Sequence, residues 1–158
     1  MAGASLECRN LWKVYGDDSR PAPDTDWNNV SATAAALRER GLVVAVSGVT
    51  LSVVPGETFV IMGLSGSGKS TVVRCLSRLV EPSAGTVAID GQDITPLSDH
   101  ELVLLRRHKM GMVFQHFGLL PHMTVVDNVM YSLTVKGAPR AEREQRARAM
   151  LDLDGLTG

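Results

Sequence analysis

Hydrophobic and polar positions along the chain predict a series of short strands. Residues 5–15 form a first candidate strand that ends at an aromatic residue, and alternation of apolar and polar residues in 43–54 predicts a second. Two shorter apolar runs, at 57–62 and 110–115, are typical of strands that are buried on both faces. A further strand is expected over 86–90, where Asp90-Gly91 provides a turn.

Helical spacing of apolar residues appears between these strands. An amphipathic helix is expected over 25–40, because Trp27, Val30, Ala34 and Leu37 share one face, and it has the position of an insertion. The other predicted helices follow Gly68 up to Pro82, begin at Ser98 with Glu101 as a capping box, begin at Thr124, and begin at Pro139. The alternation of strands and helices predicts one α/β domain with a largely parallel core sheet.

Composition excludes several classes of function. The 158 residues carry a net charge of −1, so no nucleic-acid partner is indicated, and the arginines at 106–107 and 140–148 are interpreted as exposed helix surface. Neither an export signal nor an apolar run of about 18 residues is evident. The two cysteines, Cys8 and Cys75, lack metal-ligand spacing and are expected to be reduced thiols.

One short motif carries the chemistry. Residues 63–70 read Gly-Leu-Ser-Gly-Ser-Gly-Lys-Ser and lie between an apolar run and a helical pattern. Glycines allow successive backbone amides to converge on an anion, and the following helix directs its positive end to the same place. Lys69 adds a full charge and the Ser70 hydroxyl is a Mg²⁺ ligand of the usual kind. The motif predicts a nucleoside triphosphate site, with ATP preferred; the alternative is a flexible Gly/Ser loop.

Three segments together resemble the ATPases of ABC transporters. Residues 63–71 are similar to that family's phosphate loop, and Met112–Gln115 resembles its Q-loop, a strand that ends in glutamine. Lys13-Val14-Tyr15-Gly16 resembles its A-loop, in which an aromatic ring stacks on adenine.

The resemblance is sharper for importers of quaternary amines such as glycine betaine and proline. It rests on residues 57–65, on Arg78–Pro82, on 117–125 and on the extra helix at 25–40. It implies a P-loop NTPase fold of the ABC ATPase type, with N-terminal antiparallel strands and the start of a helical subdomain. Over 1–158 these parts would be the first strand and A-loop (5–16), the inserted helix (25–40), the strand, P-loop and helix (57–82), and the Q-loop with the start of the helical subdomain (110–158).

The resemblance also assigns site residues. Tyr15 would stack on adenine, and Lys69 and Gln115 would act in catalysis, with Ser70 and Gln115 near Mg²⁺. The phosphates would be wrapped by Gly63, Leu64, Ser65, Gly66, Ser67, Gly68, Lys69, Ser70 and Thr71. His116 and Phe117 would face a membrane-embedded permease. The implied partners are ATP, that permease and a second ATP-binding subunit in a homodimer, on the cytoplasmic face of the membrane.

Several motifs that hydrolysis needs in this family are not found. The sequence holds no apolar strand ending in Asp-Glu, no Leu-Ser-Gly-Gly-Gln-like signature and no switch histidine. We therefore expect the chain to correspond to the N-terminal portion of such an ATPase and not to turn over ATP by itself. The alternatives are a non-catalytic nucleotide-binding or regulatory module, or another P-loop NTPase such as a small-molecule kinase.

Overall fold

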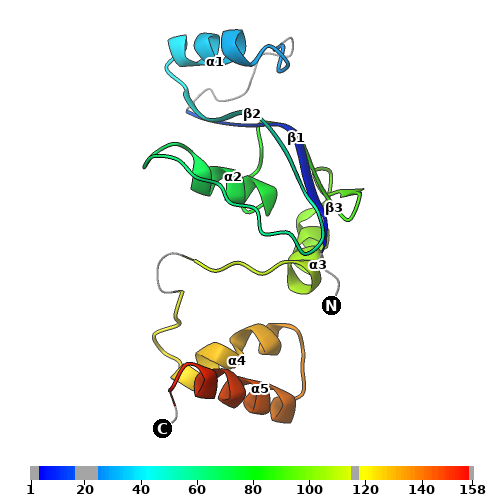
Figure 1. Ribbon diagram of the computed structural model, residues 1–158, viewed down its shortest axis with the longest axis vertical. Helices are drawn as coiled ribbons and strands as arrows, with labels where there is room; N and C mark the ends of the chain where they lie inside the picture. The colour runs from blue at the N-terminus through cyan, green and yellow to red at the C-terminus, as the bar shows by residue number, and fades with distance from the viewer. Residues whose placement is uncertain (1–3, 17–24, 115–117, 157–158) are drawn as a thin grey trace. The chain divides into compact units, whose positions relative to one another are not determined.

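The computed structural model describes residues 4–16, 25–114 and 118–156. The chain divides into two compact units, residues 1–102 and 103–158, which we call the sheet unit and the helical unit (Figure 1).

A four-stranded antiparallel sheet forms the sheet unit. Its strands are β1 (Leu6–Tyr15), β2 (Val43–Val53), β3 (Ala84–Ile89) and β4 (Gln92–Asp93), in the order β2-β1-β3-β4. β1 lies between β2 and β3, and pairs Leu6 with both Val53 and Ile89. The antiparallel N-terminal strands implied by the family resemblance are confirmed.

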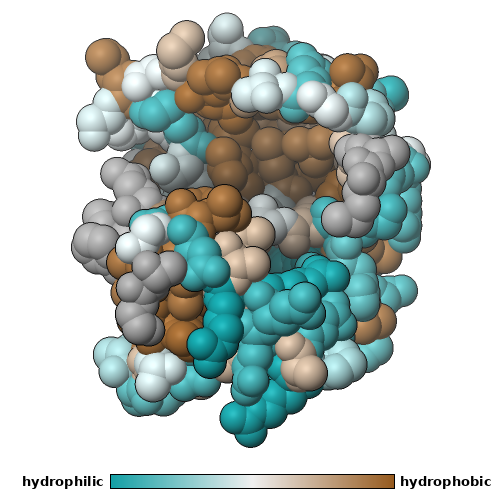
Figure 2. Space-filling model, turned by 60° about the horizontal axis from the view of Figure 1, so that its bottom comes forward, coloured by the Kyte–Doolittle hydropathy of each residue, from teal (hydrophilic) through white to brown (hydrophobic). Residues whose placement is uncertain are grey.

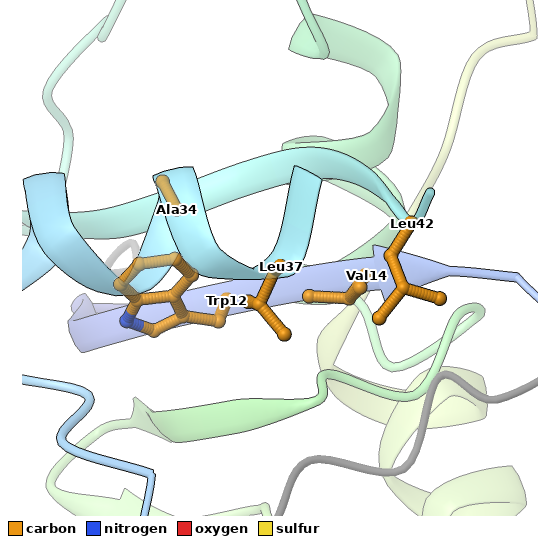
Figure 3. Close-up of a cluster of buried hydrophobic side chains, with 5 residues drawn as sticks. All are labelled: Trp12, Val14, Ala34, Leu37 and Leu42. Carbon is orange, nitrogen blue, oxygen red and sulfur yellow. The ribbon is translucent and has the colours of Figure 1, made fainter. Parts of the chain in front are cut away.

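Helix α1 (Val30–Glu39) covers one face of the β1–β2 pair. Asn29 caps it, and its apolar face packs on β1 in a cluster of Trp12, Val14, Ala34, Leu37 and Leu42 (Figure 3). Val30 packs against the same cluster, which confirms the apolar face predicted from Val30, Ala34 and Leu37. Trp27 packs there too, but it lies before the N-cap, so the predicted start of the helix at residue 25 is wrong. Burial of this cluster is the main hydrophobic contribution that fixes α1 to the sheet.

Helix α2 (Lys69–Leu76) lies on the opposite face of the β1–β2 pair (Figure 1). The prediction that it continues to Pro82 is wrong. Arg78 adopts a left-handed φ of +52°, and the amides of Arg78 and Leu79 donate to Cys75 O and Arg74 O. This pair of bonds is a Schellman motif, which ends the helix at Leu76, two residues before Arg78.

The two short strands predicted from apolar runs are not formed. Residues 57–62 and the described residues 110–114 have no strand pairing, and Met62 and Val113 are 86% and 99% exposed. Within the described residues the sheet is antiparallel, so the predicted parallel core sheet is also absent. A strand buried on both faces needs hydrogen-bonded neighbours, and none of the described segments pairs with these two. Hydrophobic side chains accordingly reach the surface over broad areas (Figure 2).

Two antiparallel helices, α4 (Val125–Val135) and α5 (Arg140–Leu153), form most of the helical unit. Thr124 Oγ1 accepts from Asp127 N at 3.1 Å and so caps α4, as predicted, and Pro139 precedes the first residue of α5. Gly137, at φ +76°, follows the C-terminal end of α4.

Helix α3 (Asp99–Lys109) runs across the division between the two units. The capping box predicted at its start is confirmed: Ser98 N donates to Glu101 Oε2 at 2.8 Å and Glu101 N donates to Ser98 Oγ at 3.4 Å. Ser98 Oγ also donates to Glu101 Oε2, at 2.6 Å, and this bond, followed by the one from Ser98 N, lowers the pKa of Glu101 from its ordinary value. Among the described helices, none combines the length and the apolar character required for a membrane crossing.

Both cysteines are free and buried. Burial raises the pKa of the Cys8 thiol and of the Cys75 thiol, which keeps them protonated and unreactive.

Candidate phosphate-binding site

The glycine-rich loop at 63–68 connects the extended segment 57–62 to the first turn of α2. Gly66 and Gly68 both adopt left-handed backbone conformations, with φ of +79° and +88°. Gly68 is the N-cap of α2, and no side chain caps that helix end. The first backbone amides of α2 therefore have no acceptor within the helix and remain available to an external anion.

Close packing makes Gly68 the most constrained position of the loop. A Cβ atom built at Gly68 would lie 2.2 Å from Ala45 O of β2, which is far inside van der Waals contact. A Cβ at Gly63 would lie 2.7 Å from Ser67 Oγ, across the loop. The loop thus rests directly on β2 at one end and folds over itself at the other.

The Lys69 side chain curls back over the loop that precedes it. Its Nζ donates to Gly63 O at 2.9 Å and to Leu64 O at 2.7 Å. The ammonium is consequently held against the backbone of the loop, at its exposed surface. A cation and a set of free helix amides directed at one concavity are the requirements of a phosphate site.

Tyr15 lies near this loop through its pairing with β2. It ends β1 opposite Val43, which is two residues before Ala45, the residue that Gly68 contacts. Tyr15 is 41% exposed, so part of the residue's surface is available to a ligand. Lys13 Nζ lies 4.8 Å from the centroid of the same ring.

The predicted magnesium ligands are only partly described. Ser70 lies in the first turn of α2 and is exposed, where its hydroxyl can bind a cation that also binds phosphate oxygens. Gln115 lies outside the described residues, as do His116 and Phe117. The described residues contain no group of three or more His, Cys, Asp or Glu side chains able to hold a metal.

A separate open cavity of about 410 Å³ lies between α4 and α5 in the helical unit. Tyr131, Asp127 and Arg143 are among its lining residues, and no residue of the phosphate loop lines it. Arg143 donates to Thr134 Oγ1 at 2.6 Å, whereas Arg140 and Arg146 pair with glutamates one turn away on exposed helix surface. The interpretation of Arg140 and Arg146 as solvated helix surface is thus confirmed, while Arg143 is half-buried.

Comparison with protein-family models assigns the chain to a family. The family model described as ABC transporter matches residues 46–157, which include the whole phosphate loop. The chain belongs to the ABC transporter family.

The similar members of the ABC transporter family include transport ATP-binding proteins of bacteria. The trimethylamine N-oxide transport system ATP-binding protein TmoW of Ruegeria pomeroyi is 47% identical over the full chain, which covers 46% of that protein. The glycine betaine/proline betaine transport system ATP-binding protein ProV of Escherichia coli is 46% identical over 96% of the chain, which covers 38% of that protein. The chain therefore spans less than half the length of these curated relatives.

Solved ABC cassettes share the fold. The ATP-binding cassette MJ0796, in a dimeric post-hydrolysis state bound to ADP and Pi, matches 93% of this chain with a TM-score of 0.72 and 32% identity. This chain covers 56% of that cassette. A second dimeric structure of MJ0796 gives a TM-score of 0.73 with the same coverage. The predicted α/β fold of the ABC ATPase type, present in part, is confirmed.

Two residues that contact or end α2 do so in ways that no local sequence pattern predicts. The carbonyl of Ala45 lies so close to residue 68 that only a glycine fits there. An alanine within a strand gives no sequence signal of this contact. Arg78 stabilises the end of α2 from a left-handed position that glycine usually occupies.

Proposed function

We propose that this chain is the nucleotide-binding part of an ATP-binding subunit of an ABC importer for quaternary amines such as glycine betaine or proline. In this proposal the loop at 63–71 binds the phosphates of ATP, Ser70 and Gln115 bind Mg²⁺, and Tyr15 stacks on adenine. A permease and a second ATP-binding subunit would complete the transporter, with the chain held at the cytoplasmic face of the membrane by the permease.

The observation that carries the proposal is the arrangement of Lys69. Its ammonium is held over the loop by Gly63 O and Leu64 O, beside the end of α2 that lacks a side-chain cap. Bound polyphosphate would replace these two contacts with neutral carbonyls by contacts with oppositely charged oxygens, which are stronger. The solutes in the names of TmoW and ProV, trimethylamine N-oxide and glycine betaine/proline betaine, support the solute class, because the chain resembles both proteins along nearly its whole length.

Binding of Mg-ATP to the full chain, measured by calorimetry, tests the proposal. Lys69→Ala should abolish detectable binding, because it removes the ammonium that lies against the loop at Gly63 O and Leu64 O. Lys136→Ala, at the exposed C-cap of α4, is the matched control and should bind as the unaltered chain does. A folded chain that takes up no Mg-ATP, or a Lys69→Ala variant that binds equally well, would refute the proposal.

A second candidate function is nucleotide binding without hydrolysis. The missing Asp-Glu strand, signature and switch histidine favour it for this chain taken alone, since phosphoryl transfer needs several charge-neutralising parts at once. Steady-state phosphate release from the purified chain decides the question. Turnover that disappears in Lys69→Ala would rule out the non-hydrolysing alternative.

A further inference from the structure

Lys13 and Tyr15 lie on the same face of β1, two residues apart. Their neighbours Trp12 and Val14 point to the other face, into the cluster beneath α1 (Figure 3). Lys13 Nζ lies 4.8 Å from the centroid of the Tyr15 ring, within the range of a cation–π contact. One face of the half-exposed ring is therefore occupied by a cation.

Lys13 is itself held from the other side. Its Nζ donates to Glu81 O at 2.8 Å, in the segment that connects α2 to β3. The ammonium thus bridges a fixed backbone carbonyl and the tyrosine ring.

The carbonyl that anchors Lys13 belongs to a well-fixed residue. Glu81 Oε2 accepts from Arg78 Nη2 at 2.5 Å and from Arg78 Nε at 2.9 Å. The Arg78 guanidinium is buried and also donates to Ile94 O at 2.7 Å and to Thr95 O. A continuous chain of polar contacts therefore runs from the exit of β4 through Arg78, Glu81 and Lys13 to the Tyr15 ring.

We propose that Lys13 is a positioning residue for base recognition: its ammonium holds one face of the Tyr15 ring and leaves the opposite face for the nucleotide base. This inference rests on the proposed function of the site. An aromatic side chain at a strand end can rotate about χ1 and χ2, and fixing it before a ligand arrives lowers the entropy lost on binding. Lys13 acts through Tyr15, so its effect should depend on the base and not on the phosphates.

The experiment compares Mg-ATP with magnesium tripolyphosphate, which has phosphates but no base, by calorimetry on the full chain. Lys13→Met keeps the length of the side chain and removes its charge. We expect it to weaken Mg-ATP binding about two- to fivefold and to leave tripolyphosphate binding unchanged. Lys13→Arg, which retains a cation able to lie over the ring, should restore most of the lost affinity.

A double-mutant cycle separates positioning from a general structural effect. In a Tyr15→Ala background, Lys13→Met should cause no further loss of Mg-ATP affinity, because the ring on which it acts is gone. Lys136→Met, far from the loop in sequence and exposed, is the matched control for removal of a lysine charge. Lys13→Gln provides a second, polar variant if Lys13→Met does not fold.

Two results would overturn the inference. An equal loss of affinity for Mg-ATP and tripolyphosphate would place the action of Lys13 at the phosphates, and unchanged Mg-ATP affinity would remove the role altogether. Absence of binding of both ligands to the unaltered, folded chain is a different result, since it refutes the proposed function itself.

Discussion

The strands around β1 and the extended segments 57–62 and 110–114 are all rich in apolar residues. The former are paired in a sheet, and the latter are not. Trp12 in β1 is fully buried, with β2 and β3 paired on its two sides, whereas Val113 is almost fully exposed. Both kinds of segment are rich in β-branched and aromatic residues. The difference shows that strand propensity becomes a strand only where the partners that complete its hydrogen bonds lie within reach.

The relatives are much longer than this chain, which bears on the contrast between paired and unpaired segments. TmoW and ProV are more than twice the length that the chain matches. Segments 57–62 and 110–114 have no strand partner among the described residues, and several of their apolar side chains are exposed. Exposed apolar edges of this kind favour pairing with other chains, so aggregation of the isolated chain is expected to begin there.

The largest effect is expected from Trp12→Ala. The substitution removes the largest side chain of the cluster beneath α1 together with the Trp12 Nε1 bond to Asn10 Oδ1 at 2.9 Å. We expect a loss of about 3–5 kcal/mol in the free energy of unfolding, measured by urea denaturation. Trp12→Phe should lose less, because it keeps most of the buried apolar area. A Trp12→Ala variant within about 1 kcal/mol of the unaltered chain would contradict the assignment of this cluster as the core.

The second effect tests the contact between the loop and the sheet. Gly68→Ala introduces a Cβ atom at 2.2 Å from Ala45 O in a residue with φ of +88°. We expect a loss of about 2 kcal/mol or more in stability and a clear loss of Mg-ATP affinity, since the backbone must move. Gly66→Ala is the matched control: φ is +79° but no atom lies within 4 Å of the added Cβ. Equal losses for the two variants would show that the approach of Gly68 to β2 has no special role.

The sequence could predict those features of the structure that depend on residues close together in the chain. The capping box at Ser98, the cap at Thr124 and the turn at Asp90-Gly91 each depend on residues within a few positions of one another. The phosphate loop belongs to the same class, because its glycines and Lys69 act within one segment. These features formed as expected.

Features that join residues far apart in the sequence could not be predicted from the pattern of apolar and polar residues. The strands predicted at 57–62 and 110–114 depend on partners elsewhere in the chain, and sequence alone does not show whether those partners are present. Asn10 is a similar case: its Nδ2 donates to Trp27 O at 3.1 Å, across 17 residues, from a left-handed φ of +48°. Nothing in the run around Asn10 indicates that it joins β1 to the segment before α1.

A smaller effect is expected at the start of α3. Ser98→Ala removes the capping box and should cost about 1 kcal/mol near neutral pH. Because Ser98 lowers the pKa of Glu101 in the folded state, the unfolded state binds the proton more readily. The contribution is therefore present above the ordinary pKa of a glutamate, about 4.3, and is lost as pH falls through the lower folded value.

Urea denaturation between pH 7 and pH 3 measures this prediction. The difference in stability between the unaltered chain and Ser98→Ala should be constant at neutral pH and shrink below about pH 4. Glu101→Gln keeps an acceptor at the third helical position and removes the titrating group, so in a Glu101→Gln background the effect of Ser98→Ala should not change with pH. A pH-independent effect of Ser98→Ala in the chain that keeps Glu101 would contradict the role of the carboxylate.

The smallest effect on stability is expected from a substitution in an unpaired segment, Val113→Ala. Val113→Ala removes two methyl groups from a side chain that is 99% exposed, so we expect a change within about 0.5 kcal/mol. Val87→Ala is the matched control, since the same two methyl groups are fully buried in β3 and their removal should cost about 1–3 kcal/mol. A loss above about 1 kcal/mol for Val113→Ala would show that residues 110–114 are buried in solution. In a longer protein that supplies a neighbouring strand, the cost at Val113 should rise toward that at Val87, because burial and not sequence decides what a valine contributes.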